Sequence, residues 1–305
     1  MKIKKRYIFL LILALIGLLV WAGILWWRGG PVRYVTATPA QYAAKVLRNI
    51  SYLEGSTTFS PKNQLDLHLP IGLDQAPVAV ILHGGGWTLG DRGIPEVQKI
   101  AEWFAQRGTI GVPMGYRLVP QVSVLEQAAD VAAGVAWVYR HINEYGGNPE
   151  RIFLLGHSAG GQLASLILCD REYLDRFNIP HSIPAGMIAL STPFFFTGQA
   201  DQVNPLARKM AEDVFHHDPK LCAAASPLKF VHSGMPPFLI LIGTGDHIVP
   251  ADQAPKMTAA LQAAGNPVIL KKISGRGHIN LFHRMIEPGD IAGETALAFI
   301  NGMQE

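Results

Sequence analysis

The sequence predicts an α/β fold in which helices cover both faces of a mostly parallel central sheet. From about residue 40 onward, short apolar segments alternate with longer segments of helical periodicity. Some of the short segments, such as residues 78–82 and 152–155, are apolar throughout, as in strands that are buried on both faces. The chain has 305 residues, which is enough for one large α/β domain and an additional segment.

The N-terminus is predicted to be a membrane segment. Residues 7–27 form a run of 21 residues without a charge, which as a helix spans about 31 Å, the thickness of the hydrocarbon core of a bilayer. Tryptophans gather near its far end, and basic residues precede it: Trp21, Trp26, Trp27, Lys2, Lys4, Lys5 and Arg6. The positive-inside rule places the N-terminus in the cytoplasm and the rest of the chain outside it, as in a single-pass membrane protein.

A cleaved signal peptide is the alternative to an uncleaved anchor at this position. Its apolar region is expected to be shorter and to end at small residues, whereas here the apolar run continues through residues 23–27. We therefore expect an anchor at 1–28, a linker at 29–45 that begins with Gly29, Gly30 and Pro31, and a catalytic domain at 46–305.

The composition of the remaining chain excludes some partners. Residues 1–33 hold six basic residues and no acidic one, so the rest carries 20 basic against 23 acidic residues. This near-neutral part has no basic run that indicates nucleic-acid binding. The two cysteines, Cys169 and Cys222, have no zinc-type spacing and are expected to be buried thiols, although a disulfide outside the cytosol stays open.

The expected elements follow in chain order. Residues 65–69 alternate with period two, as in an exposed or edge strand, and apolar runs predict further strands at 78–82, 109–114, 152–155, 187–190, 238–242 and 268–273. Helical spacing predicts helices at 124–142, 162–169 and 252–264. Ligands bind at the carboxyl ends of the strands in such sheets, so chemistry is expected in the loops that follow them.

One of these loops is Gly156-His157-Ser158-Ala159-Gly160, which has the G-x-S-x-G pattern between a strand and a helix. This pattern is typical of a sharp turn that lifts the serine Oγ into a cleft. Glycines two residues to either side are needed because a Cβ there would collide with the neighbouring strand and helix. Ser158 is therefore the expected nucleophile, with the N–H of Ala159 at the positive end of a helix.

A second loop, His83-Gly84-Gly85-Gly86-Trp87, follows the strand at 78–82. Consecutive glycines let backbone N–H groups approach a ligand closely and donate to the oxyanion of a tetrahedral intermediate. A plain glycine turn is the alternative, but the position one strand from the serine loop favours the functional interpretation.

A serine hydroxyl needs a base, and the base needs an acid that orients it. Asp246 and His278 each follow a predicted strand, and the order Ser158, Asp246, His278 is the order typical of this arrangement. Asp252 is an alternative acid, although it is expected to cap a helix. His283 is an alternative base within an expected helix.

Other histidines are weaker candidates. His216 and His217 are adjacent, so their side chains diverge on a helix, and no third metal ligand accompanies them. His157 is expected to pack beneath the serine loop.

With these motifs in place, the chain resembles the α/β-hydrolase family, and within it the carboxylesterase branch related to hormone-sensitive lipase and the arylformamidases. The resemblance covers roughly residues 50–300. Besides the two glycine loops, Asp246 and His278, it rests on Gly90-Asp91, on Gly115-Tyr116-Arg117-Leu118-Val119-Pro120 and on Gly146-Gly147-Asn148-Pro149 before Arg151.

The resemblance implies roles for individual residues. Ser158 would be the nucleophile, His278 the base and Asp246 its orienting acid. Gly85, Gly86 and Ala159 would donate to the oxyanion, Trp87 would line the pocket, and neither a cofactor nor a metal would be needed. We expect a serine esterase for small to medium esters. An arylformamidase-like amidase, an envelope polysaccharide deacetylase and a non-catalytic binding module are the alternatives.

The stretch 191–233 departs from the branch pattern and does not align with any substrate-defining cap. It begins Ser191-Thr192-Pro193-Phe194-Phe195-Phe196. We expect it to form a lid or an acyl pocket. The three phenylalanines then either line that pocket or belong to the ordinary core.

Overall fold

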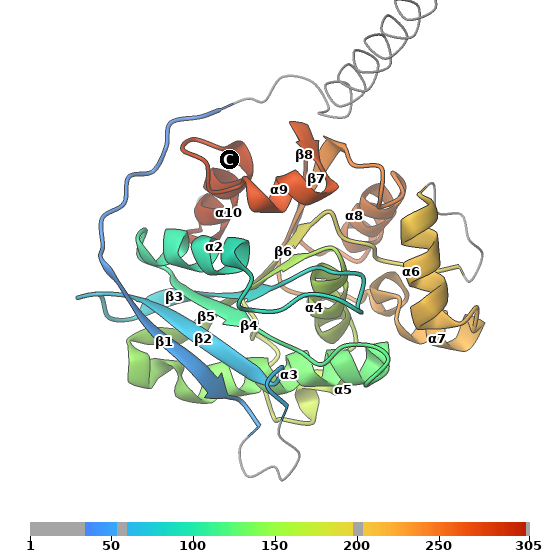
Figure 1. Ribbon diagram of the computed structural model, residues 1–305, viewed down its shortest axis with the longest axis horizontal. Helices are drawn as coiled ribbons and strands as arrows, with labels where there is room; N and C mark the ends of the chain where they lie inside the picture. The colour runs from blue at the N-terminus through green and yellow to red at the C-terminus, as the bar shows by residue number, and fades with distance from the viewer. Residues whose placement is uncertain (1–33, 54–59, 198–203, 303–305) are drawn as a thin grey trace, which may run out of the picture.

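A computed structural model describes residues 34–53, 60–197 and 204–302 of the chain (Figure 1). It contains an eight-stranded sheet with the strand order β1-β2-β4-β3-β5-β6-β7-β8. The pairs β1–β2 and β2–β4 are antiparallel and the other pairs are parallel, which confirms the mostly parallel sheet. The strands are β1 (Ala44–Ser51), β2 (Gln64–Pro70), β3 (Ala76–Leu82), β4 (Ile110–Met114), β5 (Gly147–His157), β6 (Gly186–Leu190), β7 (Phe238–Gly245) and β8 (Val268–Gly277).

Helices cover both faces of this sheet, as predicted. Successive strand residues point to opposite faces: Val80 and Leu82 belong to one core cluster, whereas Ala79 and Ile81 belong to the other. The first cluster includes α3 (Val124–His141), α4 (Ala159–Cys169), α5 (Glu172–Asp175) and α8 (Gln253–Ala263). The second includes α2 (Pro95–Ala105), α9 (His278–His283) and α10 (Ile291–Ile300), which lie on the opposite side of the sheet in Figure 1.

The capping of α3 shows why this helix starts where it does. The Ser123 side chain accepts a hydrogen bond from the Glu126 N–H, and the Glu126 carboxylate accepts one from the Ser123 N–H. This reciprocal pair satisfies two donors that a helix start leaves without partners. The buried face behind it begins at Val124, as the helical spacing predicted.

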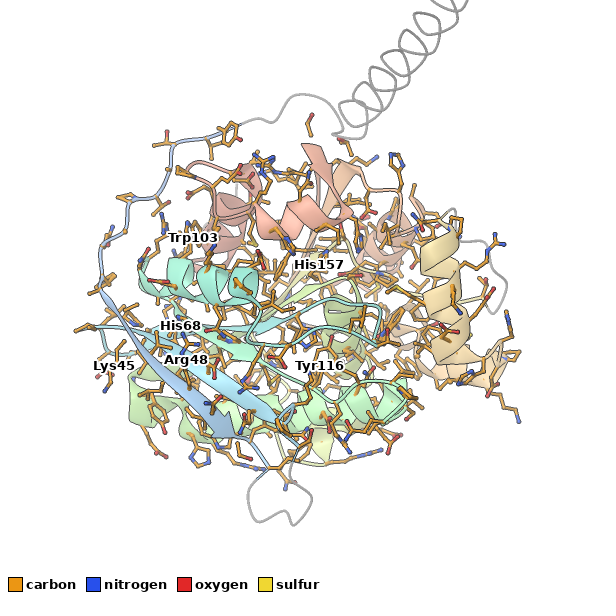
Figure 2. The ribbon with its side chains drawn as sticks, viewed as in Figure 1. Lys45, Arg48, His68, Trp103, Tyr116 and His157 are labelled. Carbon is orange, nitrogen blue, oxygen red and sulfur yellow. The ribbon has the colours of Figure 1, made fainter. Side chains whose placement is uncertain are left out.

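The strand predicted at residues 65–69 is confirmed, but its predicted position as an exposed or edge strand was wrong. These residues lie in β2, which pairs with β1 on one side and β4 on the other, and Leu65 and Leu67 are fully buried. The edges of the sheet are β1 and β8, and no strand was predicted at the position of β1. Figure 2 labels Arg48 on β1 and His68 on β2, where Arg48 and the carboxylate of Asp66 approach to 3.7 Å.

The first described residues lie against the sheet domain. The Tyr34 hydroxyl donates to Glu287, the Val35 N–H donates to the Gly289 carbonyl oxygen at 2.8 Å, and the Thr38 hydroxyl donates to Glu294 at 2.6 Å. These hydrogen bonds tie part of the predicted linker at 29–45 to α10 and to the turn before it, and β1 begins inside the predicted linker at Ala44.

In the part of the chain that the structure describes, no helix combines the length and the apolar character needed to cross a bilayer. The membrane segment predicted at residues 7–27 lies outside the described residues. The anchor and the export of the catalytic domain therefore stay predictions.

The stretch 191–233 contains two helices and a short 3-10 helix where the structure describes it. They are α6 (Pro205–Phe215), α7 (Pro219–Ala224) and η2 (Pro227–Phe230). Phe194 is fully buried in the core, whereas Phe196 lines a cavity beside Ser158. Phe194 therefore fits the core interpretation and Phe196 the pocket, whereas the ring of Phe195 lies beneath the Lys256 Nζ, 4.7 Å from it. Cys222 on α7 and Cys169 on α4 are both buried.

Candidate active site

Ser158 lies in the turn between β5 and α4 with an unusual backbone conformation. Its φ of 53° and ψ of −120° fall outside the regions that residues with a Cβ ordinarily occupy. Such strain persists only where the surrounding structure imposes it, and it concentrates at functional sites. The Ser158 N–H donates to the Leu190 carbonyl oxygen at 3.0 Å, which fastens the turn to β6.

The glycines on either side of Ser158 are required by close packing, as predicted. A Cβ on Gly156 would lie 2.5 Å from the Gly161 Cα, and one on Gly160 would collide with the carbonyl oxygen of His83 at the end of β3. The strand, the helix and the neighbouring glycine loop therefore approach the turn too closely for any side chain.

His278 connects Ser158 to Asp246. The His278 Nε2 lies 3.0 Å from the Ser158 Oγ, and the His278 Nδ1 lies 3.0 Å from the Asp246 Oδ2. Asp246 directly follows β7, and His278 directly follows β8, so both stand at the carboxyl ends of neighbouring parallel strands. The structure thus brings the three predicted residues into one hydrogen-bonded chain.

The surroundings of Asp246 favour its ionised form. Burial opposes ionisation, but the hydrogen bond from His278 and the charge of that ring favour it, and the Ile248 N–H donates to the Asp246 Oδ1 at 2.9 Å. Together they hold the pKa of this carboxyl below its ordinary value. An ionised Asp246 accepts from the His278 Nδ1–H, so the proton-free Nε2 faces the Ser158 hydroxyl.

The alternative acid and base lie elsewhere. Asp252 precedes α8, but its carboxylate makes no cap bond and instead pairs with Lys256 at 2.6 Å on the surface. His283 is exposed at the end of α9. His216 and His217 are exposed at the end of α6, and no group of three metal-ligating side chains occurs among the described residues.

The glycine loop at residues 83–87 shares a cavity with Ser158 and His278. Gly85 and Gly86 have φ values of 127° and 57°, and a Cβ on Gly85 would collide with the Leu89 carbonyl oxygen. Ala159 is the first residue of α4, so its N–H lies at the positive end of that helix. Gly85 and Gly86 line the cavity, and Ala159 is buried next to Ser158.

Two buried histidines, His83 and His157, support the loops around the cavity. The His83 ring stacks on Tyr116 with 4.4 Å between ring centroids, and the Tyr116 hydroxyl donates to the His83 carbonyl oxygen. His157 donates from Nε2 to the His278 carbonyl oxygen at 2.9 Å and stacks on Phe282. Figure 2 labels His157 in the interior. His157 packs beneath the sharp turn that carries Ser158, as predicted, and its hydrogen bond also ties this turn to the segment that contains His278.

Burial keeps both of these rings neutral, and this has a consequence for stability. Burial lowers the pKa of His83 from 6.5 to about 4, and burial together with the His278 charge lowers the pKa of His157 to about 3. Between these values and 6.5 the unfolded chain binds protons that the folded protein resists. Lowering the pH through this range therefore favours unfolding.

We accordingly expect the free energy of unfolding to fall as the pH is lowered from about 6.5 to about 4.5, by up to ~1.4 kcal/mol per pH unit for each such histidine. Carboxylates with lowered pKa values, such as Asp246, lose their contribution only near and below pH 4. Urea titrations across this range measure the slope. His83→Phe keeps the stacking on Tyr116 and should show a shallower slope, and an unchanged slope would contradict the argument.

An apolar cavity of about 160 Å³ opens beside the Ser158 hydroxyl. Trp87 lines it, as predicted, and so do Pro193, Phe196 and Met210 from the stretch 191–233. Gln162 and Met210 were not predicted to belong to the site. Gln162 is fully buried one turn into α4, and its Oε1 accepts a hydrogen bond from the Trp87 Nε1 at 2.7 Å. No motif marks either residue, because their roles depend on contacts between distant segments.

The fold and this site define the class: the chain is an α/β hydrolase with a serine elbow. A family model confirms it more narrowly, because the BD-FAE model matches residues 65–261. The chain belongs to the BD-FAE family, a member of the esterase group of α/β hydrolases.

Curated relatives carry related names. The chain is 31% identical over 75% of its length to a probable carboxylic ester hydrolase, LipM, of Mycobacterium tuberculosis, covering 55% of that protein. It is 28% identical over 79% of its length to the isoprenylcysteine alpha-carbonyl methylesterase ICME of Arabidopsis thaliana, covering 58% of that protein. The chain thus spans about half the length of the curated relatives it matches.

A solved structure supports the fold. The butyrate-bound esterase Est2 of Thermogutta terrifontis is similar to the chain with a TM-score of 0.63 and 25% identity. The match covers 87% of this chain and 93% of that one.

Proposed function

We propose that the chain hydrolyses carboxylic esters of small to medium size through an acyl-enzyme on Ser158. The observation that carries the proposal is the hydrogen-bonded chain from the Ser158 Oγ through His278 to Asp246 beside an apolar cavity. A serine, a base and an acid in this contact are the parts that acyl transfer requires. Names of relatives, which include carboxylic ester hydrolase and methylesterase, support the same activity.

In the first step the Ser158 Oγ attacks the ester carbonyl carbon while its proton moves to the His278 Nε2. The carbonyl π electrons move to the oxygen, and the N–H groups of Gly85, Gly86 and Ala159 would stabilise that oxyanion. Asp246 stabilises the imidazolium that forms and stays ionised.

The intermediate then collapses. The bond between the carbonyl carbon and the alcohol oxygen breaks, and the His278 Nε2–H protonates the departing alcohol. A water molecule next attacks the acyl-enzyme and gives a proton to the His278 Nε2. The bond between the carbonyl carbon and the Ser158 Oγ then breaks, the His278 Nε2–H returns the proton to that Oγ, and the acid leaves. Every proton is accounted for by His278, so these steps need no cofactor.

An amidase of arylformamidase type would use the same three residues, and so would a polysaccharide deacetylase. The cavity favours apolar esters over sugars, because an apolar wall leaves the hydroxyl groups of a buried sugar without partners. A binding module without catalysis would have no need of the strained Ser158 or of the ionised Asp246.

Hydrolysis assays on the full chain test the proposal. We expect p-nitrophenyl butyrate to be cleaved at least ~10²-fold faster than butyryl p-nitroanilide, because the amide has the poorer leaving group and a more stable ground state. A fluorophosphonate should label the peptide that contains Ser158, as read by mass spectrometry. Faster cleavage of the anilide or of formanilides would support the amidase instead. If the full chain neither hydrolyses these substrates nor reacts with the fluorophosphonate, the catalytic assignment is overturned.

A further inference from the structure

Met210 occupies a distinctive place in the cavity. It lies on α6, in the stretch 191–233, and its side chain rests against the glycine loop. A Cβ built on Gly86 would lie 2.6 Å from the Met210 Sδ and 3.0 Å from its Cε. A residue more than 120 positions away in the sequence therefore contacts the backbone that would hold the oxyanion.

The proposed chemistry assigns the two sides of the cavity to the two halves of an ester. His278 has to protonate the departing alcohol, so the alcohol lies on the side of the His278 Nε2. That side is lined by Ile279, next to the base, and by Ile248 and Val249, whose N–H groups bind Asp246. The acyl chain consequently lies on the other side.

That other side is a wall of Trp87, Phe196 and Met210. The Trp87 ring is held by its hydrogen bond to Gln162 and meets Phe196 edge to face, with 5.6 Å between ring centroids. It meets Phe215 in the same way at 5.3 Å. The aromatic part of the wall is therefore braced on several sides, and a longer acyl chain cannot displace it without breaking a buried hydrogen bond.

Met210 is the adjustable part of this wall. It is only partly buried, and its unbranched side chain fills space without a hydrogen bond. The cavity volume of about 160 Å³ suits a short chain. The residues that line the cavity include no aspartate, glutamate, lysine or arginine in the part of the chain that the structure describes. A charged acyl group would thus be desolvated without a counter-charge.

Resting on the proposed function, we propose that Met210 sets the upper limit of acyl length, and that the site takes esters of short, uncharged, apolar acids. The thioether closes the acyl side against Gly86, so a chain that extends past it has to push α6 away from the glycine loop. A shorter side chain at position 210 should let the cavity accept longer acyl chains, and a larger side chain should restrict it to shorter ones.

The test is a series of p-nitrophenyl esters from acetate to octanoate on the full chain, with kcat/KM measured for each. The wild type should prefer the short esters. Met210→Ala should raise the octanoate-to-butyrate ratio of kcat/KM by about 10-fold or more, since a few methylene groups in an apolar pocket change this ratio by that order. Met210→Phe should shift the preference toward acetate.

Lys209→Ala is the matched control, because Lys209 is exposed on the same helix and pairs with Asp213. It should keep the wild-type ratio. An unchanged ratio in both Met210 variants, with normal thermal denaturation, overturns the role of Met210 while leaving the esterase proposal intact. A wild type that cleaves none of the esters overturns both proposals.

Ile279→Ala tests the direction of binding. It should change the ratio between methyl and benzyl butyrate and leave the acyl-length ratio as in the wild type. If Ile279→Ala shifts the acyl-length ratio and Met210→Ala shifts the alcohol ratio, the ester binds in the opposite direction and the inference is wrong.

Discussion

Replacing Ser158 with alanine should lower kcat for p-nitrophenyl butyrate by about 10⁴- to 10⁶-fold. The substitution removes the only atom that would form the acyl-enzyme, and the remaining loop donors supply little of the rate without it. The hydroxyl takes part in the hydrogen bond to the His278 Nε2, and Ser158 is only partly buried, so little packing is lost with one oxygen atom. Thermal denaturation should therefore stay close to that of the wild type while activity is lost.

Ser165→Ala is the matched control for this variant. Ser165 lies on the same helix, α4, and its buried Oγ has no hydrogen-bond partner among the residues that the structure describes. Removing an unpaired buried hydroxyl is close to neutral for stability, so this variant should keep nearly full activity. Comparable rates for Ser158→Ala and the wild type would show that another group, or a contaminant, hydrolyses the ester. A fluorophosphonate should label the wild type and leave Ser158→Ala unlabelled, so any activity that the reagent removes from the variant preparation belongs to a contaminant.

Much of the central sheet could be predicted from the sequence because parallel strands are buried on both faces. Val78, Val80 and Leu82 point to one core and Ala79 and Ile81 to the other, so no polar residue interrupts the run. The edge strand β1 could not be predicted as well, unlike β8 at the other edge. β1 contains Lys45, Arg48 and Asn49, because an edge strand faces solvent, and this polar pattern carries no strand signal. The alternation in β2 was therefore mistaken for that of an edge.

The helix α2 shows a different kind of omission. Val97, Ile100 and Phe104 lie on one buried face at helical spacing, so the signal is present in the sequence. No helix was nevertheless predicted at residues 95–105, which follow the Gly90-Asp91 motif closely in the sequence.

Some residues of the site could likewise be predicted from the sequence, and others could not. Ser158, Asp246 and His278 were predictable because each follows a strand, and strands in a parallel sheet bring their carboxyl ends to one edge. Met210 and Gln162 were not, because each acts through a contact between segments far apart in the chain. Met210 lies on the stretch 191–233, whose packing against Gly86 depends on three-dimensional shape rather than on a local motif. Substrate preference is accordingly the property that the sequence alone predicts least.

Asp246→Asn should lower kcat by about 10⁴-fold at neutral pH and leave the KM much less affected. The Asp246 carboxylate accepts from the His278 Nδ1–H, and this keeps the unprotonated Nε2 toward Ser158. An asparagine can donate its amide N–H to Nδ1, which then places the proton on Nε2. The ring in that tautomer cannot accept the Ser158 proton. The Ile248 and Val249 N–H groups can still donate to the amide oxygen, so the loop should keep its conformation.

Asp252→Asn separates this role from a general effect of charge. Asp252 lies six positions further along, its side chain is 50% exposed, and it pairs with Lys256 rather than with a histidine. An exposed pair of this kind contributes little to stability, so activity should stay within about twofold of the wild type. If the two variants lose activity equally, the orienting role of Asp246 is wrong and the local negative charge is what matters. If only Asp252→Asn loses it, the acid of the site is Asp252, and the hydrogen bond between His278 and Asp246 is structural.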